Sequence, residues 1–83
     1  MGEVILVYRV LPDSPENSGK LKKNLAVLNP RRIEEEPIAF GLNAYKVTLI
    51  VPDEGGIQDK TEEQLAKIKN LESFELLMAS RSM

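Results

Sequence analysis

The sequence contains no cysteine and no histidine among its 83 residues. Without cysteine it can form no disulfide and can use no thiol chemistry. Without either residue, most transition-metal sites and most nucleophile–base pairs are excluded as well. The remaining reactive groups are carboxylates, lysines, arginines and hydroxyls, and we expect the protein to hold no metal and no cofactor of its own.

Long apolar runs are also absent. No stretch approaches the roughly 18 apolar residues of a membrane span. The apolar run at the N-terminus is bracketed by Glu3 and Arg9, which does not fit a secretion signal. We therefore expect a cytoplasmic protein with no membrane partner.

A strong excess of one charge is missing too. The chain has 11 basic and 13 acidic residues, a formal net charge of −2. General nucleic-acid binding needs many cations facing phosphates, so this balance argues against a nucleic-acid partner. Hydrophobic residues make up 42% and charged residues 29%, an ordinary mixture. The length predicts one domain, residues 1–83, with a core of two layers.

The apolar periodicity predicts four strands and two helices. Apolar residues alternate with a period of two where strands are expected, and recur at helical spacing where helices are expected. The predicted strands are residues 3–11, 32–40, 44–51 and 72–79, and the predicted helices are residues 18–28 and 58–69.

This βαββαβ order predicts an α+β fold, a ferredoxin-like sandwich. Its antiparallel sheet has four strands in the order 4-1-3-2, and both helices cover one face. The first strand is apolar on both faces, which suits a central position. Pro37 removes a hydrogen-bond donor from the second strand, which is tolerated at a sheet edge.

Alternation assigns side chains to the two faces of the predicted sheet. Tyr8 and Tyr45 fall on the core face, so the open face lacks the aromatic side chains with which such sheets bind RNA. An apolar patch with a polar rim on the open face is typical of a site for a protein partner. The patch is predicted to contain Ile5, Val7, Ile50, Leu77 and Ala79, with Arg9, Lys46 and Arg81 at its rim.

Three further features were considered as functional sites. The carboxylates of residues 34–36 alternate between faces and cannot converge on one ion. Gly55-Gly56 lacks the lysine and the spacing of a phosphate-binding loop, so we interpret it as a turn. Phe40 precedes the Gly41 turn, and the sequence leaves open whether it seals the core edge or anchors a contact.

The stretch EEEPIAFGLNAYKVTLIVPD, residues 34–53, closely resembles the signature of the archaeal-type elongation factor 1-beta family. Its most specific part is the block Glu-Glu-Pro-Ile-Ala-Phe-Gly-Leu, residues 35–42. The N-terminal MGEVILVYRVLPDSPE and the segment LESFELLMASR, residues 71–81, fit the same family.

This resemblance implies the ferredoxin-like fold and a role as guanine-nucleotide exchange factor for elongation factor 1-alpha, a GTPase. It implies binding without enzymatic catalysis and without a cofactor. Arg81 corresponds to a basic residue that intrudes on the partner's magnesium site, and Phe40 to an aromatic residue beside the partner. We predict partner contacts at Phe40, Gly41, Lys46, Leu77 and Arg81.

Two alternatives accompany this prediction. One is a ferredoxin-like interaction module without exchange activity. The other is a small enzyme of the acylphosphatase type, which needs a phosphate-binding loop with an arginine after the first strand. The loop at residues 12–15 is acidic and rich in proline, which disfavours the enzyme.

Overall fold

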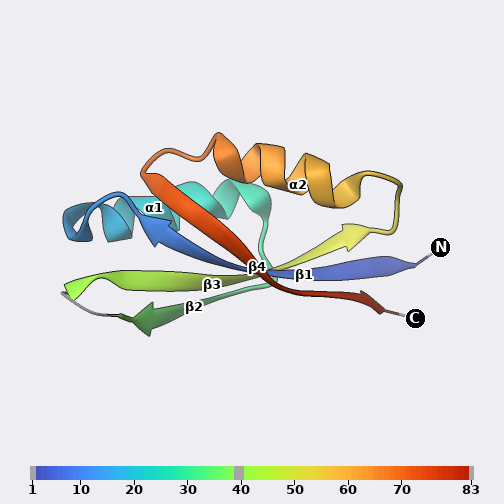
Figure 1. Ribbon diagram of the computed structural model, residues 1–83, viewed down its shortest axis with the longest axis horizontal. Coiled ribbons are helices and arrows are strands. Elements are labelled where there is room, and N and C mark those ends of the chain that lie inside the picture. Colours follow the sequence, from blue (N-terminus) through green and yellow to red (C-terminus); the bar gives the residue numbers. More distant parts are fainter. Residues whose placement is uncertain (1, 39–40, 83) are drawn as a thin grey trace.

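Strands and helices follow one another in the order β1–α1–β2–β3–α2–β4, which confirms the predicted βαββαβ order (Figure 1). The computed structural model describes residues 2–38 and 41–82. The helices are α1 (Ser18–Leu25) and α2 (Ile57–Ala66). The strands are β1 (Glu3–Pro12), β2 (Arg32–Pro37), β3 (Asn43–Pro52) and β4 (Leu71–Ser82).

The four strands form one antiparallel sheet in the order β2-β3-β1-β4, which is the predicted order counted from the other edge. Both helices lie on the same side of it, so the molecule has two layers and one face of the sheet stays uncovered (Figure 1). The molecule measures 42 × 21 × 17 Å, with its long axis along the strands. No helix in the described residues has both the length and the apolar character needed to cross a membrane.

The core lies between the sheet and the helices. It is built from alternate residues of β1 and β3, together with one side of each helix. Each helix contributes side chains from helical spacing, Leu21 and Leu25 from α1 and Leu65 from α2, all fully buried. Pro37 lies in β2, an edge strand as predicted.

Two buried tyrosines connect the sheet to the helices. The Tyr8 hydroxyl donates to Oε2 of Glu62 in α2 at 3.1 Å, and the Tyr45 hydroxyl donates to the Ser18 carbonyl of α1 at 3.0 Å. Their predicted place on the core face is confirmed. Burial is the main cause that raises the pKa of both phenols, and for Tyr8 the hydrogen bond to Glu62 raises it further.

Some boundaries differ from those predicted. The first helix continues after Leu25 as a 3₁₀ turn, Ala26–Leu28, and Asn29 ends it in the left-handed conformation with φ 50°. Helix α2 ends at Ala66 rather than at residue 69. Strand β4 extends to Ser82, three residues beyond its predicted end, because it remains paired with β1 along its whole length.

Candidate functional site

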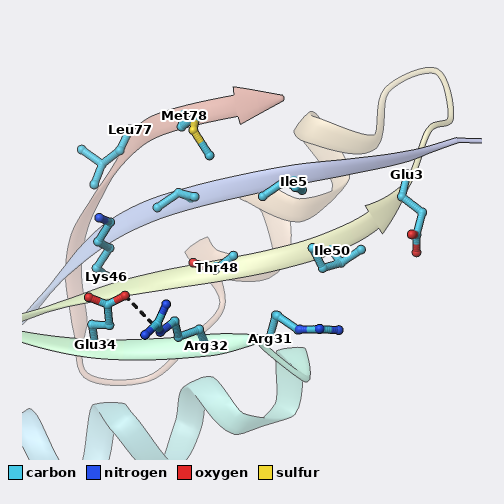
Figure 2. A pocket seen from close by; sticks show the side chains of 11 residues that line it. Glu3, Ile5, Arg31, Arg32, Glu34, Lys46, Thr48, Ile50, Leu77 and Met78 are labelled. Carbon is cyan, nitrogen blue, oxygen red and sulfur yellow. Dashed lines mark ion pairs between the residues drawn. The ribbon is translucent and has the colours of Figure 1, made fainter. Parts of the chain in front are cut away.

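The uncovered face of the sheet, called the open face below, contains a hollow with a volume of about 940 Å³ (Figure 2). Side chains from all four strands line it. Strand β1 contributes Ile5 and Val7, β3 contributes Thr48 and Ile50, and β4 contributes Leu77 and Met78. Charged side chains complete the lining: Glu3, Arg31, Arg32, Glu34 and Lys46.

A β-bulge in β4 determines which of its residues reach this hollow. Tyr8 is opposite Leu76, whereas its neighbour Val7 is opposite Met78, so Leu77 is an extra residue in the ladder. Opposed residues share a face, and each residue beyond the bulge is therefore shifted to the other side of the sheet. Met78 lies on the open face beside Val7, and Leu77 also lines the hollow.

The bulge overturns part of the predicted face assignment. Ala79 and Arg81 were expected on the open face, and this expectation is wrong. Ala79 is opposite Leu6 and Arg81 is opposite Val4, two residues of the core face, so both point toward the helix side. Of the remaining open-face predictions, Ile5, Val7, Ile50, Leu77 and Lys46 line the hollow, whereas Arg9 lies on the same face but outside the lining.

At the hairpin end of the open face, charges are paired within the chain. Arg9 of β1 reaches across β3, with its Nε 3.3 Å from Oε2 of Glu36 in β2. A second pair joins Arg9 Nη1 to Oε2 of Glu75 in β4 at 3.9 Å. Ala44 of β3, directly opposite Glu36, is fully buried on this face.

Closer to the hollow, the charges are less balanced. Arg32 Nε is 3.2 Å from Oε1 of Glu34 on the same strand. Lys46 is the cross-strand neighbour of Glu34. Within residues 2–38 and 41–82, neither Lys46 nor Arg31 forms an ion pair with a carboxylate.

Arg81 is the next-to-last residue of β4, at the end of the sheet where the chain begins (Figure 1). Its side chain is 78% exposed, and its Nε is 3.4 Å from Oδ2 of Asp53. Asp53 follows β3 directly, and its backbone N–H donates to the Gly2 carbonyl at 3.1 Å. The predicted end of the last strand at residue 79 would leave Arg81 beyond the sheet, and it is wrong, since Arg81 is still within β4.

Gly41 occupies the opposite end, in the connection between β2 and β3. Its φ of 75° lies in the left-handed region, which glycine adopts without the strain of a side chain. The Ile38 N–H donates to the Leu42 carbonyl at 2.8 Å and closes the connection. Phe40 lies outside the described residues, so its two interpretations stay open.

The predicted contact residues thus do not form one compact cluster. Gly41 and Arg81 lie at opposite ends of a molecule 42 Å long, and Lys46 and Leu77 lie between them on the open face. Sequence reasoning missed Met78, Arg31 and Asp53. The apolar character of Met78 was visible, but its face depended on the bulge.

The acidic residues of β2 alternate as predicted. Glu34 and Glu36 lie on the open face, whereas Glu35 lies on the helix side, 3.4 Å from the Tyr45 hydroxyl. No group of three or more potential ligand side chains gathers in the described parts of the chain to hold a metal ion. The surface offers shape, apolar contact and charge, which are the means of binding a partner.

Comparison with known proteins identifies the family of the chain. Residues 5–81 match the family described as "EF-1 guanine nucleotide exchange domain". The chain is similar to elongation factor 1-beta of Methanoregula boonei, with 42% identity over 80 residues, 93% of this chain and 94% of that protein. It is similar to the elongation factor 1-beta of Methanobrevibacter smithii, with 37% identity over the full length of both.

The chain belongs to the EF-1 guanine nucleotide exchange domain family. The resemblance carried by residues 34–53 is thereby confirmed. The match to the exchange domain begins at Ile5 in β1 and ends at Arg81 in β4, so it includes both ends of the molecule and the hollow between them. The matched range contains Gly41, Lys46, Leu77 and Arg81, which are exposed or half-buried in the structure.

Proposed function

We propose that this protein promotes the exchange of GDP for GTP on elongation factor 1-alpha. The observation that carries this proposal is the match of residues 5–81 to the exchange domain. Relatives covering nearly the whole chain are named elongation factor 1-beta, including one from Methanosphaerula palustris with 40% identity over 79 residues, which include 92% of this chain and 93% of that protein. The protein acts by binding and forms no covalent intermediate.

The thermodynamic requirement for this function is small. An exchange factor needs to bind the nucleotide-free GTPase more tightly than the GDP-bound form. By linkage, the factor then lowers the affinity for GDP by the same ratio. A rigid surface with apolar and charged contacts is sufficient, because the exchange factor itself binds no nucleotide.

The positions of the contact residues support an extended docking geometry. Gly41, at the β2–β3 connection, and Arg81, at the end of β4, are separated by most of the 42 Å length. A single partner that contacts both must lie along the sheet, beside Lys46 and Leu77 on the open face, and must also reach around the end of β4 to Arg81, whose side chain points toward the helix side. We propose these four residues, together with Phe40, as the contact set.

Arg81 is the proposed group that disturbs the magnesium and phosphate site. Magnesium demands nearly octahedral oxygen coordination, often through phosphate oxygens and water. A guanidinium that approaches this site repels the ion and donates to the same oxygens, and it stays protonated at any working pH. Arg81 suits this role because its side chain is 78% exposed, although its Nε lies 3.4 Å from Oδ2 of Asp53.

The direct test is the release of labelled GDP from purified elongation factor 1-alpha with and without this protein. We expect the protein to raise the release rate, and to reach a plateau as its concentration increases. Binding to the GTPase with no change in release would instead favour an interaction module without exchange activity. An absence of both effects would reject the proposal.

A further inference from the structure

The hollow on the open face has a floor of apolar side chains that the fold does not cover. Ile50 is 37% exposed, Leu77 is 36% exposed and Met78 is 47% exposed. Ile5 is opposite Ile50, and Val7 is opposite both Thr48 and Met78, so the floor is continuous across β3, β1 and β4 (Figure 2). Neighbouring strands lie about 4.8 Å apart, which makes the floor about 10 Å wide.

The border of this floor has an excess of positive charge. Arg31, Arg32 and Lys46 line the hollow, against two carboxylates, Glu3 and Glu34. Arg32 is already paired with Glu34 at 3.2 Å, whereas Arg31 and Lys46 have no ion-pair partner in residues 2–38 and 41–82. Figure 2 shows Lys46 and the two arginines along the β2–β3 side of the hollow, with Met78 across it.

In the other half of the same face, acidic side chains outnumber basic ones. There a single cation, Arg9, is paired with two carboxylates, Glu36 and Glu75. The positive border is therefore a local property of the hollow rather than of the whole sheet. It also differs in sign from the chain as a whole, which has a net charge of −2.

We infer that the hollow is the docking site for an apolar segment of the GTPase that is bordered by acidic side chains. This inference rests on the proposed function, since it names the surface by which that partner is bound. Apolar side chains of the segment cover Ile50 and Met78, and its carboxylates face Lys46 and Arg31. The position fits, because the hollow lies between the two ends, Gly41 and Arg81, that a lengthwise contact must include.

Met78 allows the sharpest test, since it lies on an edge strand and is 47% exposed. Met78→Asp places a carboxylate against the acidic border of the segment, whereas Met78→Lys removes the same apolar contact but adds an attractive charge. The matched control is Val27→Asp, in the 3₁₀ turn after α1 and 73% exposed, which lies in the helix layer on the other side of the sheet. Arg31→Glu tests the border independently, through an exposed residue that is not in a strand.

Two readouts separate the inference from the function on which it rests. The first is the dissociation constant for nucleotide-free elongation factor 1-alpha, measured by titration calorimetry. The second is the GDP-release rate as a function of factor concentration. Circular dichroism and the melting temperature of each variant confirm its fold, and sedimentation of the protein alone detects self-association.

We expect Met78→Asp to raise the dissociation constant about tenfold or more, which is the range of a central interface residue. Met78→Lys should raise it less, Arg31→Glu should raise it severalfold, and Val27→Asp should leave it within about twofold. The factor concentration that gives half-maximal GDP release should rise in the same order of variants. If Met78→Asp does not fold, the Arg31→Glu result decides.

Wild-type exchange with unchanged affinity in Met78→Asp and Arg31→Glu would overturn the docking site and leave the proposed function intact. Binding that these variants weaken, without any acceleration of GDP release, would support the site and reject the exchange function. A wild type that does not bind the GTPase would overturn both. A dimer that Met78→Asp dissociates, with no effect on GTPase affinity, would assign the hollow to a second copy and overturn the inference.

Discussion

The two faces of the sheet are made by the same strands but are used differently. On the helix side, Tyr8, Val10 and Val47 are fully buried and connect to both helices. On the open face, Ile50 and Met78 remain 37% and 47% exposed, although both are apolar. One face therefore stabilises the fold, and the other leaves apolar surface exposed.

Open-face residues in the central strands are not all exposed. Val7 is on the open face and yet only 5% exposed, because β1 has a neighbouring strand on each side and Thr48 and Met78 lie beside it. Substitutions that test the open face should therefore avoid the middle of β1. Positions on β4 and in the loops change the surface with a smaller effect on folding.

The largest expected contrast between the faces concerns two leucines. Leu65→Ala removes a fully buried side chain from α2 and should cost about 2–5 kcal/mol in the free energy of unfolding. Leu77→Ala removes the same group from the open face, where the leucine is 36% exposed, and should cost about 1 kcal/mol or less. Urea denaturation of both variants measures the contrast, and equal losses would show that the open face is covered in the protein alone.

Sequence periodicity was sufficient to assign the side chains of β1 and β3 to the two faces of the sheet. The β1–β3 ladder has a regular register without a bulge, so the period of two along each strand placed Tyr8 and Tyr45 correctly in the core. The strand order followed from Pro37 and from the two apolar faces of β1. These features depend on local patterns that the tertiary structure preserves.

The bulge in β4 could not be predicted in this way. Leu76, Leu77 and Met78 are three consecutive apolar residues, so alternation does not show which of them points to the core. Only the register with β1 shows that Leu77 is extra and that Met78 changes face. The Asp53–Arg81 pair depends on this same shift, and it joins residues far apart in the sequence.

On the helix side, the buried tyrosines should make the free energy of unfolding decrease at alkaline pH. Tyrosine ordinarily ionises near pH 10, and the pKa of both phenols is raised in the fold. Above that pH the unfolded chain loses its phenol protons first, so stability present below pH 10 is lost as the pH rises. Each fully protected phenol contributes a slope of about 1.4 kcal/mol per pH unit.

Tyr8→Phe should therefore flatten the decline in stability above pH 10. At neutral pH it should cost about 0.5–1.5 kcal/mol, because the hydrogen bond to Glu62 is lost. Urea titrations at neutral and alkaline pH measure both effects, and Tyr45→Phe is the matched variant, since its hydroxyl binds a backbone carbonyl. Parallel curves for wild type and Tyr8→Phe would mean that the Tyr8 phenol ionises freely in the fold.

Arg81, on the helix side, and Arg9, on the open face, should differ in their effect on GDP release. Arg81→Ala should lower the maximal GDP-release rate about tenfold, which corresponds to about 1.4 kcal/mol, while docking is largely kept. Arg9→Ala, whose guanidinium is paired with Glu36, should instead leave that maximal rate unchanged. The measurement is GDP release at saturating factor over a range of magnesium concentrations. If Arg81→Ala keeps the full rate at every magnesium concentration, the intrusion mechanism does not use this residue.

The smallest expected effect concerns the ion pair between Asp53 and Arg81. Its Nε–Oδ2 distance is 3.4 Å and Arg81 is 78% exposed, so solvent screens the pair and its contribution to stability should be about 0.2–1 kcal/mol. A double-mutant cycle of Asp53→Asn and Arg81→Ala measures this coupling free energy, and high salt should reduce it.

The same cycle tests whether Asp53 positions Arg81 for exchange. If it does, Asp53→Asn should lower the maximal GDP-release rate toward that of Arg81→Ala, and the double variant should be no slower than Arg81→Ala alone. If Asp53 instead restrains Arg81, Asp53→Asn should raise the maximal rate, because the guanidinium is released from its partner. Unchanged rates in Asp53→Asn would limit the pair to its small effect on stability, and would leave the bulge as the feature that directs Arg81 toward the helix side.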